Sequence, residues 1–203
     1  MNYLRSFRGV VAGTDEAGRG PLAGPVVAAA VVLTREQEET LLALGLGDSK
    51  KLTPQKREAL FFAMNGLGVA WRAQAGSLNE IAKFNIAVAS LRAMGRGVRR
   101  LPLLVDLVVV DGLFEIPDLS IEQIPLVAAD SLVPSVSAAS VVAKVLRDRV
   151  MIALDRLYPE YGFARHKGYP TKEHREAVRA LGLSPVHRVA FCAKLTQRTF
   201  ERL

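Results

Sequence analysis

The chain contains one cysteine, Cys192, and lacks any hydrophobic run of the ~20 residues that a membrane-spanning helix needs. A single cysteine forms no disulfide within the chain, so we expect a reducing compartment, the cytoplasm, and no membrane partner. The three histidines, His166, His174 and His187, lack the spacing of a zinc site, and we interpret them as loop or surface residues. The Gly-x4-Gly-Lys-Ser/Thr loop of nucleotide hydrolases is also missing, which argues against that class.

Positive charge is concentrated near the C-terminus. Residues 1–143 contain 14 Lys+Arg and 14 Asp+Glu, whereas residues 144–203 contain 13 and 6, so the net charge of +7 lies in the last 60 residues. Such asymmetry is typical of a protein that binds a polyanion, most often nucleic acid, although a well-solvated basic helix surface gives the same count. We expect one domain over 1–203, with a core at about 8–157 and a basic helical part at about 158–203.

Two apolar runs, 9–13 and 26–33, have the β-branched and small residues of buried strands. Asp15 and Glu16 follow the first run and precede a turn rich in glycine and proline, with Arg19 between two glycines. Carboxylates at the edge of a core usually have a cation or another partner, and glycines let a backbone approach a ligand closely. This stretch therefore predicts a ligand site, with a hairpin of solvated acids as the simpler alternative.

The remaining pattern alternates strands with helices. Further strands are expected at 69–75, 107–110 and 124–127, and helices are expected after the capping residues Thr53, Ser77 and Thr171 and over about 137–157. The tail 186–203 is basic and only weakly patterned. Strands followed by alternating strands and helices predict an α/β domain with a mixed sheet.

Isolated acids follow three of these strands, namely Asp15, Asp111 and, slightly later, Asp130. Ligands of α/β sheets bind beyond the carboxyl ends of strands, so we expect these acids to lie together with Glu16. An all-oxygen set selects Mg²⁺ or Mn²⁺ over zinc, and four carboxylates suit two ions about 4 Å apart that hydrolyse a phosphodiester. Because adjacent strand residues point to opposite faces, Asp15 and Glu16 share a cluster only if the strand ends or kinks there.

Several ordered motifs strengthen this prediction. They are residues 15–26 (DEAGRGPLAGPV), 48–52 (DSKKL), 110–112 (VDG), 137–140 (SAAS), 142–145 (VAKV), 147–148 (RD), 161–163 (YGF) and 166–171 (HKGYPT). Together they resemble the signature of bacterial ribonuclease HII, and the likeness spans residues 10–188. It implies an RNase H-like fold, with a five-stranded mixed sheet flanked by helices and a C-terminal helical extension.

The same resemblance implies an endonuclease that hydrolyses the RNA strand of RNA–DNA hybrids and cuts 5′ of single ribonucleotides in duplex DNA. The products carry 3′-hydroxyl and 5′-phosphate ends, as ribonucleotide excision repair requires. Two Mg²⁺ or Mn²⁺ ions would serve as cofactors, bound by the catalytic acids Asp15, Glu16, Asp111 and Asp130. The partners would be RNA–DNA hybrid and ribonucleotide-containing duplex DNA.

The resemblance also implies substrate contacts. Gly18, Arg19 and Gly20 would meet the 2′-hydroxyl through backbone groups, Tyr169 would stack on the following sugar, and phosphates would meet Lys50 and, as further candidates, Lys51, Ser137 and Lys144. Asp148 lies four residues after Lys144, so we expect the two side chains to form an ion pair on the helix surface. The alternative is that Asp148 acts as an acid in the outer shell of the metal site.

This sequence departs from the family pattern in two places. Ala128 and Ala129 precede Asp130 where the family often has Lys-Gly. Loss of that cation is expected to raise the pKa of Asp130 or to alter its phosphate contact. The tail lacks the Ser-Phe-Gly-Pro found near the end of many family members, so substrate binding by the C-terminus is expected to differ. The tail segment 196–203 shows no convincing sliding-clamp motif, and we expect a monomer.

Three alternatives differ in class. Ribonuclease HIII carries an additional N-terminal substrate-binding domain, and the fourteen residues before Asp15 predict none here. A non-catalytic hybrid-binding module is disfavoured because all four acids are present. A metal-dependent phosphotransferase for small molecules would have no use for the basic C-terminal part.

Overall fold

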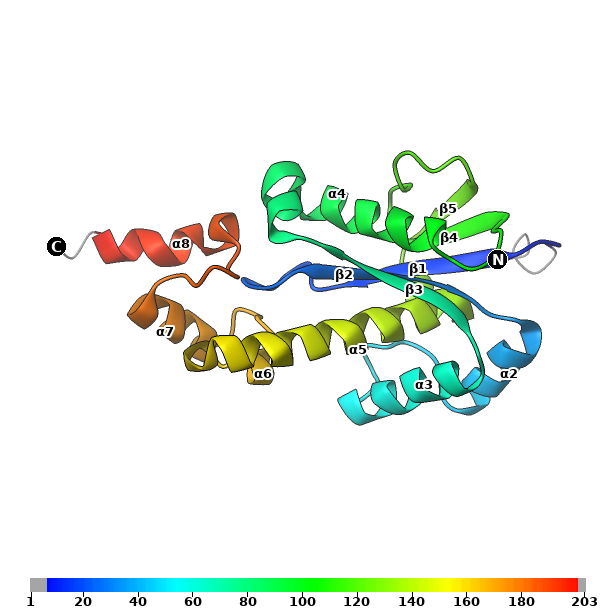
Figure 1. The fold of residues 1–203 in the computed structure, drawn as a ribbon, viewed down its shortest axis with the longest axis horizontal. Coiled ribbons are helices and arrows are strands. Elements are labelled where there is room, and N and C mark those ends of the chain that lie inside the picture. Colours follow the sequence, from blue (N-terminus) through cyan, green and yellow to red (C-terminus); the bar gives the residue numbers. More distant parts are fainter. Residues whose placement is uncertain (1–6, 201–203) are drawn as a thin grey trace.

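A five-stranded sheet forms the centre of the computed structural model, which describes the backbone of residues 7–200 and the side chains of residues 7–195 (Figure 1). The strands are β1 (Val11–Ala17), β2 (Val26–Val32), β3 (Ala70–Gly76), β4 (Leu107–Asp111) and β5 (Glu122–Leu126). Their order is β3-β2-β1-β4-β5. The pairs β1–β2 and β2–β3 are antiparallel, and the pairs β1–β4 and β4–β5 are parallel. This confirms the predicted five-stranded mixed sheet.

Helices cover both faces of the sheet (Figure 1). One face packs against α4 (Leu78–Arg99), and the other packs against α5 (Pro134–Leu157), α3 (Pro54–Gly66) and α2 (Arg35–Ala43). Every residue of β2 is buried, and successive alanines contribute to opposite cores, Ala29 to the α5 side and Ala28 to the α4 side. Thr53 and Ser77 cap α3 and α4 as expected. No helix in the described part of the chain is long and apolar enough to cross a membrane.

Three element boundaries differ from the sequence-based expectation. Strand β1 continues through the acids to Ala17, because Asp15, Glu16 and Ala17 pair in register with Ala29, Ala28 and Val27 of β2. The long helix α5 begins at Pro134 rather than residue 137, and the weakly patterned tail contains α8 (Val189–Phe200). For β1, backbone pairing with β2 therefore outweighs the turn composition that follows the acids.

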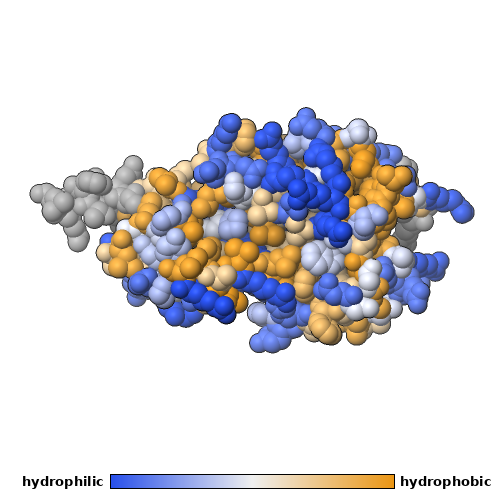
Figure 2. All heavy atoms as spheres, viewed as in Figure 1, coloured by the Kyte–Doolittle hydropathy of each residue, from blue (hydrophilic) through white to orange (hydrophobic). Residues whose placement is uncertain are grey.

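The C-terminal part packs against the end of α5 through its own small core. It comprises η2 (Pro159–Tyr161), α6 (Phe163–His166), α7 (Lys172–Leu181) and α8, and they lie together at the left of Figure 1. Met151 of α5, Phe163 and Val178 are buried in this core, and an isolated bridge pairs Ala23 with His187. This end of the chain is thereby joined to the turn between β1 and β2. Figure 2 shows hydrophilic and hydrophobic residues interspersed on the face in view.

None of the three histidines is a surface residue, since His166, His174 and His187 are 8%, 0% and 5% exposed. Of the predicted loop positions, only that of His187, between α7 and α8, is confirmed. The Ser184 backbone N–H donates to His187 Nδ1 over 3.0 Å, so His187 donates from Nε2 to His174 Nε2, also at 3.0 Å. This leaves His174 Nδ1–H to donate to the Tyr169 carbonyl at 3.0 Å. The pattern requires both rings to be neutral.

Gly13 sets the distance between β1 and α5. A Cβ at this position would lie 2.3 Å from the Val136 backbone nitrogen and 2.4 Å from the Ser135 carbonyl carbon, neither of which can rotate away. We expect Gly13→Ala to lower the free energy of unfolding by about 3 kcal/mol or more, measured by chemical denaturation. The control Gly66→Ala, with no heavy atom within 4 Å of the new Cβ, should be neutral or stabilising. Equal stability of the two variants would contradict this packing.

The buried histidines make stability depend on pH. Burial, followed by the neighbouring His174 and His166, lowers the pKa of His187 to about 4. The unfolded chain binds the proton more readily, so His187 stabilises the fold fully above about pH 6.5, and this contribution is lost as pH falls towards 4. We expect a loss of about 2 kcal/mol, with a shallower pH slope in His187→Asn, measured by denaturation at stepped pH. Identical slopes would exclude this role.

Candidate active site

The acids meet at the carboxyl ends of β1 and β4. In the parallel register Thr14 lies opposite Val110, which makes Asp15 and Asp111 neighbours at the ends of adjacent strands. Asp130 lies in the short helix η1 (Ala129–Ser131), which follows β5, and is 2% exposed. The topology thus brings acids from three separate segments to one edge of the sheet, as the sequence predicted.

Each carboxylate already has a polar partner. Asp130 Oδ2 accepts a bond from Lys50 Nζ at 3.0 Å, and Asp111 Oδ1 accepts from the Ala129 backbone N–H at 2.8 Å. Lys144 Nζ lies 3.9 Å from Asp15 Oδ2. The fourth acid is paired as well, since Arg19 Nη1 lies 3.4 Å from Glu16 Oε1. Cations at the rim therefore offset part of the mutual repulsion among the acids.

The environment of Asp15 disfavours its charged form. Burial raises the pKa of Asp15 to about 7, repulsion from Glu16 adds to the shift, and Lys144 opposes it. Burial likewise raises the pKa of Glu16, with Arg19 opposing the shift and Asp111 adding to it. Carboxyl groups with strongly raised pKa values recur at functional sites.

The pair Asp15 and Glu16 interacts although β1 neither ends nor kinks between them. Asp15 Oδ1 accepts a 2.7 Å bond from the Glu16 backbone N–H, and both side chains interact electrostatically with Asp111 and Lys144. The sequence argument made one shared metal cluster conditional on an interrupted strand, and β1 is continuous through both acids. The two carboxylates therefore interact electrostatically without forming a shared metal-binding arrangement in the described part of the chain.

The donor chemistry of the acids fits a hard divalent cation. All four candidate ligands are carboxylates, and the buried Asp15 has more negative charge around it than Lys144 offsets. In the described part of the chain, however, no three acid, histidine or cysteine side chains converge on one point in a metal-binding arrangement. Asp130 and Asp111 instead accept bonds from Lys50 and from the Ala129 N–H, each through one carboxylate oxygen.

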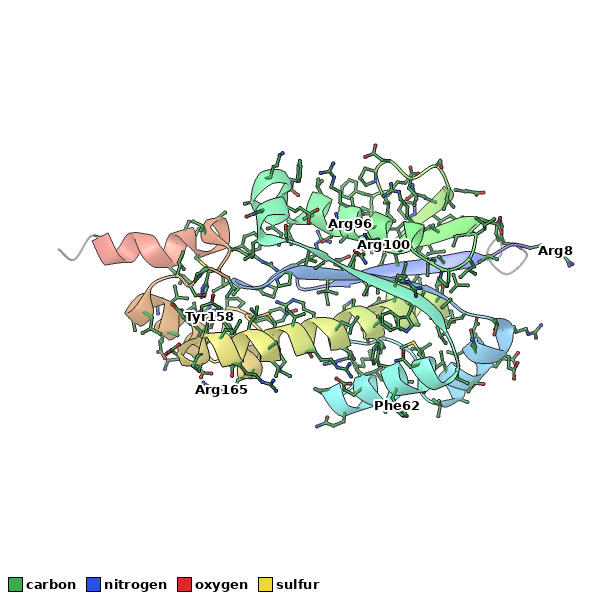
Figure 3. The ribbon with its side chains drawn as sticks, viewed as in Figure 1. Arg8, Phe62, Arg96, Arg100, Tyr158 and Arg165 are labelled. Atoms are coloured by element: carbon green, nitrogen blue, oxygen red, sulfur yellow. The ribbon has the colours of Figure 1, made fainter. Side chains whose placement is uncertain are left out.

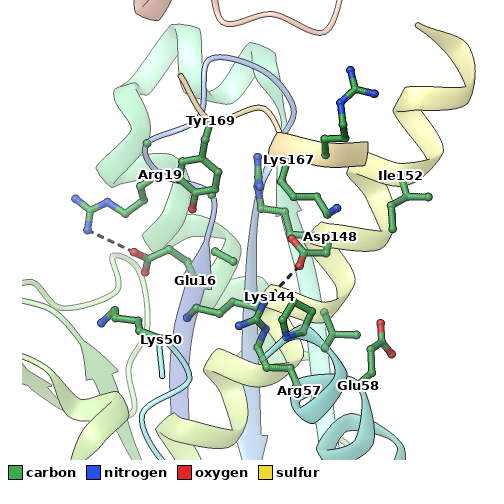
Figure 4. Close-up of a pocket in the computed structure, with 17 residues that line it drawn as sticks. Glu16, Arg19, Lys50, Arg57, Glu58, Lys144, Asp148, Ile152, Lys167 and Tyr169 are labelled. Atoms are coloured by element: carbon green, nitrogen blue, oxygen red, sulfur yellow. Dashed lines mark hydrogen bonds and ion pairs between the residues drawn. The ribbon is translucent and has the colours of Figure 1, made fainter. Parts of the chain in front are cut away.

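A pocket of about 600 Å³ opens beside the acids (Figure 4). Cations dominate its charged lining, which consists of Glu16, Arg19, Lys50, Arg57, Glu58, Lys144, Arg147, Asp148, Arg165 and Lys167. Gly18, Gly20 and Tyr169 complete one wall, and a Cβ at Gly20 would lie 3.8 Å from Tyr169 Cε1. The candidate acid Glu16, the glycine-rich turn and the tyrosine thus share one cavity of predominantly positive charge.

Three predicted residues lie where the sequence argument did not place them. Asp148 does not pair with Lys144; its Oδ2 lies 3.8 Å from Arg57 Nη2, as the dashed line in Figure 4 marks. Lys51 is largely exposed and pairs with Asp48 at 3.6 Å, away from the pocket lining. Ser137 is buried and donates its hydroxyl to the Asp130 carbonyl, so it supports η1 rather than facing the cavity.

Two arginines that shape the site were not predicted. Arg147 of α5 and Arg188, just before α8, are 2% and 4% exposed and donate to carbonyls of the turn between β1 and β2. The sequence contains a signal for Arg147, because a charged residue at this position interrupts the apolar helical face that contains Ala143 and Met151. It contains no such signal for Arg188, since the neighbouring residues show no periodic pattern. The tail segment without a clamp motif, 196–203, lies outside the side chains that the structure describes.

Comparison with known proteins agrees with the predicted family. The family model for Ribonuclease HII matches residues 12–196. Ribonuclease HII of Marinomonas sp. (strain MWYL1) is 47% identical over 185 residues, covering 91% of each chain. Ribonuclease HII of Syntrophomonas wolfei is 46% identical over 189 residues, covering 93% of this chain and 72% of the relative.

Solved structures give the same result. Ribonuclease H2 from Pyrococcus horikoshii OT3 superposes with a TM-score of 0.77 at 28% identity, covering 95% of this chain and 99% of the other. The Mn²⁺ complex of Bst-RNase HIII gives a TM-score of 0.75 at 20% identity, covering 96% and 71%, and shows the likeness of the fold alone. The protein is therefore an RNase H-like nuclease.

Within that class, the chain belongs to the ribonuclease HII family. It is a metal-dependent endoribonuclease of the type that cleaves the RNA of RNA–DNA hybrids.

The electrostatics of Asp15 can be measured directly. With divalent ions removed by EDTA, we expect the Asp15 carboxyl to titrate near pH 7, followed by carboxyl-carbon NMR and assigned with Asp15→Asn. Lys144→Met should raise this pKa further, because the ammonium 3.9 Å away favours the charged carboxylate. Titration near pH 4 in the wild type, or a lower pKa in Lys144→Met, would contradict the described environment.

Proposed function

We propose that this enzyme cuts duplex DNA 5′ of single embedded ribonucleotides as well as the RNA strand of hybrids, leaving 3′-hydroxyl and 5′-phosphate ends. The observation that carries the proposal is the shared cavity, which joins the acid cluster at Glu16 to the backbone of Gly18–Gly20 and to Tyr169. One wall can thus read a ribose while the adjacent wall acts on its phosphate.

Asp15, Glu16, Asp111 and Asp130 are the proposed ligands of two divalent ions, Mg²⁺ or Mn²⁺. Bound ions of this kind supply an activated water and stabilise the leaving oxygen of a phosphodiester. Their binding competes with the proton on Asp15, so affinity is expected to increase as pH rises through about 7. The Mn²⁺ held by the ribonuclease HIII neighbour supports the choice of a divalent ion.

Recognition of the ribonucleotide is assigned to the glycine-rich turn and Tyr169. Within the described part of the chain, the backbone N–H groups of Arg19 and Gly20 make no bond to another backbone group, and both residues are exposed. Tyr169 is 47% exposed and lies beside Gly20. Backbone donors and an aromatic ring on one wall suit a 2′-hydroxyl and a sugar face, the features that distinguish RNA from DNA.

Phosphate binding is assigned to the cations of the pocket. Lys50 pairs with Asp130, and its ammonium is partly exposed at the rim, so it can meet a phosphate next to the acids. Lys144 lies between Asp15 and the cavity, and Lys167 and Arg165 extend the positive lining towards the C-terminal part (Figure 4). The structure gives Lys51 no place in this lining, and we leave it out of the proposed contacts.

The first test uses a labelled DNA duplex with one ribonucleotide, in Mg²⁺, Mn²⁺ or EDTA. We expect one metal-dependent cut 5′ of the ribonucleotide, and a loss in Asp111→Asn larger than the ~10–100-fold typical of outer-shell changes. Asp106→Asn is the matched control, since Asp106 lies just before the opposite end of β4, where it caps the Val10 N–H at 2.8 Å. This variant should keep its activity.

The other outcomes separate the parts of the proposal. Cleavage of long hybrids without cleavage at single ribonucleotides would overturn the junction specificity and leave the family activity intact. Cleavage of an all-DNA duplex would exclude recognition of the 2′-hydroxyl by Gly18–Gly20 and Tyr169. Undiminished cleavage by Asp111→Asn would remove this acid from the catalytic set.

A further inference from the structure

The turn between β1 and β2, residues 18–25, presents most of its carbonyls to two buried guanidinium groups. Arg188 donates to four of them, from Nη2 to Gly18 at 2.7 Å, from Nη1 to Arg19 at 3.0 Å and Pro21 at 2.9 Å, and from Nε to Gly24 at 2.9 Å. Its own backbone N–H donates to the Leu22 carbonyl at 2.7 Å.

Arg147 holds the other end of the same turn. It donates from Nε to the Pro25 carbonyl at 3.2 Å and from Nη2 to the Ala23 carbonyl at 3.3 Å. Its side chain also occupies the space where Gly18 lacks a Cβ, since a Cβ there would lie 1.9 Å from Arg147 Nε, and the φ of +98° at Gly18 favours glycine. The turn is therefore shaped around two arginine side chains.

These guanidinium groups are unusual because carbonyl dipoles are their main partners. Neither makes an ion pair with a carboxylate within the described ranges, and burial lowers the pKa of Arg188 to about 10, with repulsion from Arg147 adding to the shift. Two like charges buried side by side are costly. Their planar donors nevertheless bind several carbonyls at fixed angles, which orders a backbone that has no regular secondary structure.

The carbonyl bonds decide which way the turn faces. With the Gly18 and Arg19 carbonyls bound to Arg188, the N–H groups of Arg19 and Gly20 remain on the exposed side, next to Tyr169. The turn is also tied to the segment that carries Tyr169, because the Leu22 N–H donates to the carbonyl of Gly168, one residue before Tyr169. The two proposed readers of the ribonucleotide are thus held at one spacing.

We propose that Arg188 is a positioning residue for ribonucleotide specificity, which holds the 18–25 turn so that its N–H groups face the 2′-hydroxyl. This inference rests on the function proposed above for Gly18–Gly20 and Tyr169. Arg188 acts through the turn, because its side chain is buried and three of its nitrogens are used by carbonyls. It therefore affects which substrate is bound more than the acids that cut it.

The test compares Arg188→Met and Arg188→Lys with wild type. Binding is measured in EDTA by fluorescence anisotropy, with one duplex containing a single ribonucleotide and an otherwise identical all-DNA duplex. We expect Arg188→Met to lose at least about tenfold in affinity for the ribonucleotide duplex with little change for the all-DNA duplex. Arg188→Lys should show an intermediate ratio, because a point charge with three donors cannot span four separated carbonyls.

The control is Arg96→Met, because Arg96 also donates to a backbone carbonyl, that of Ala75, but from α4 across the sheet (Figure 3). Its preference for the ribonucleotide should match that of the wild type. Guanidinium added to Arg188→Ala should restore part of the lost preference, an effect that a general loss of stability does not give.

Each outcome bears on one statement. If wild type shows no preference for the ribonucleotide duplex and does not cut it, the proposed function fails. If wild type shows the preference and Arg188→Met keeps it, or loses affinity for both duplexes equally while its thermal unfolding is unchanged, the positioning role of Arg188 is overturned.

Discussion

The close contact between β1 and α5 is the constraint on which the rest of the structure depends. A glycine at position 13 lets the start of α5 approach the strand to backbone distance. From that crossing, successive turns of α5 bring Ser137 to η1, Lys144 to the acids and Arg147 to the 18–25 turn. One straight helix thus places supports for both the metal-binding and the ribose-reading parts of the proposed site.

Much of the fold and the acid cluster could be predicted because the determining signals are local. Buried strands appear as apolar runs, helix starts appear as capping residues, and acids that follow parallel strands meet at one sheet edge whatever the details of packing. The boundaries were less predictable. Strand β1 runs through Asp15 and Glu16 because β2 lies alongside it, and that pairing is not visible in the residues of β1 alone.

The partners of individual side chains depended on tertiary contacts. Spacing along α5 favoured a pair between Lys144 and Asp148, but Asp15 and Arg57, far away in sequence, are the nearer partners. The histidines were expected in loops or at the surface because no zinc spacing was present. Histidine can also be buried without a metal when neutral rings hydrogen-bond to each other and to backbone carbonyls, as His187 and His174 do. Lys50 supplies to Asp130 the positive charge that the residues before it, Ala128 and Ala129, do not.

The contact between Arg188 and Gly18 joins residues 170 positions apart. Contacts of such separation form late, because closure of a long loop costs entropy before the contact stabilises anything. During synthesis the acids, β1 and α5 are all added to the chain before Arg188. The sheet and its carboxylates can therefore assemble first, and the turn proposed to read the ribose becomes ordered only once Arg188 is present. Selectivity for ribonucleotides would then be the last property of the active site to mature.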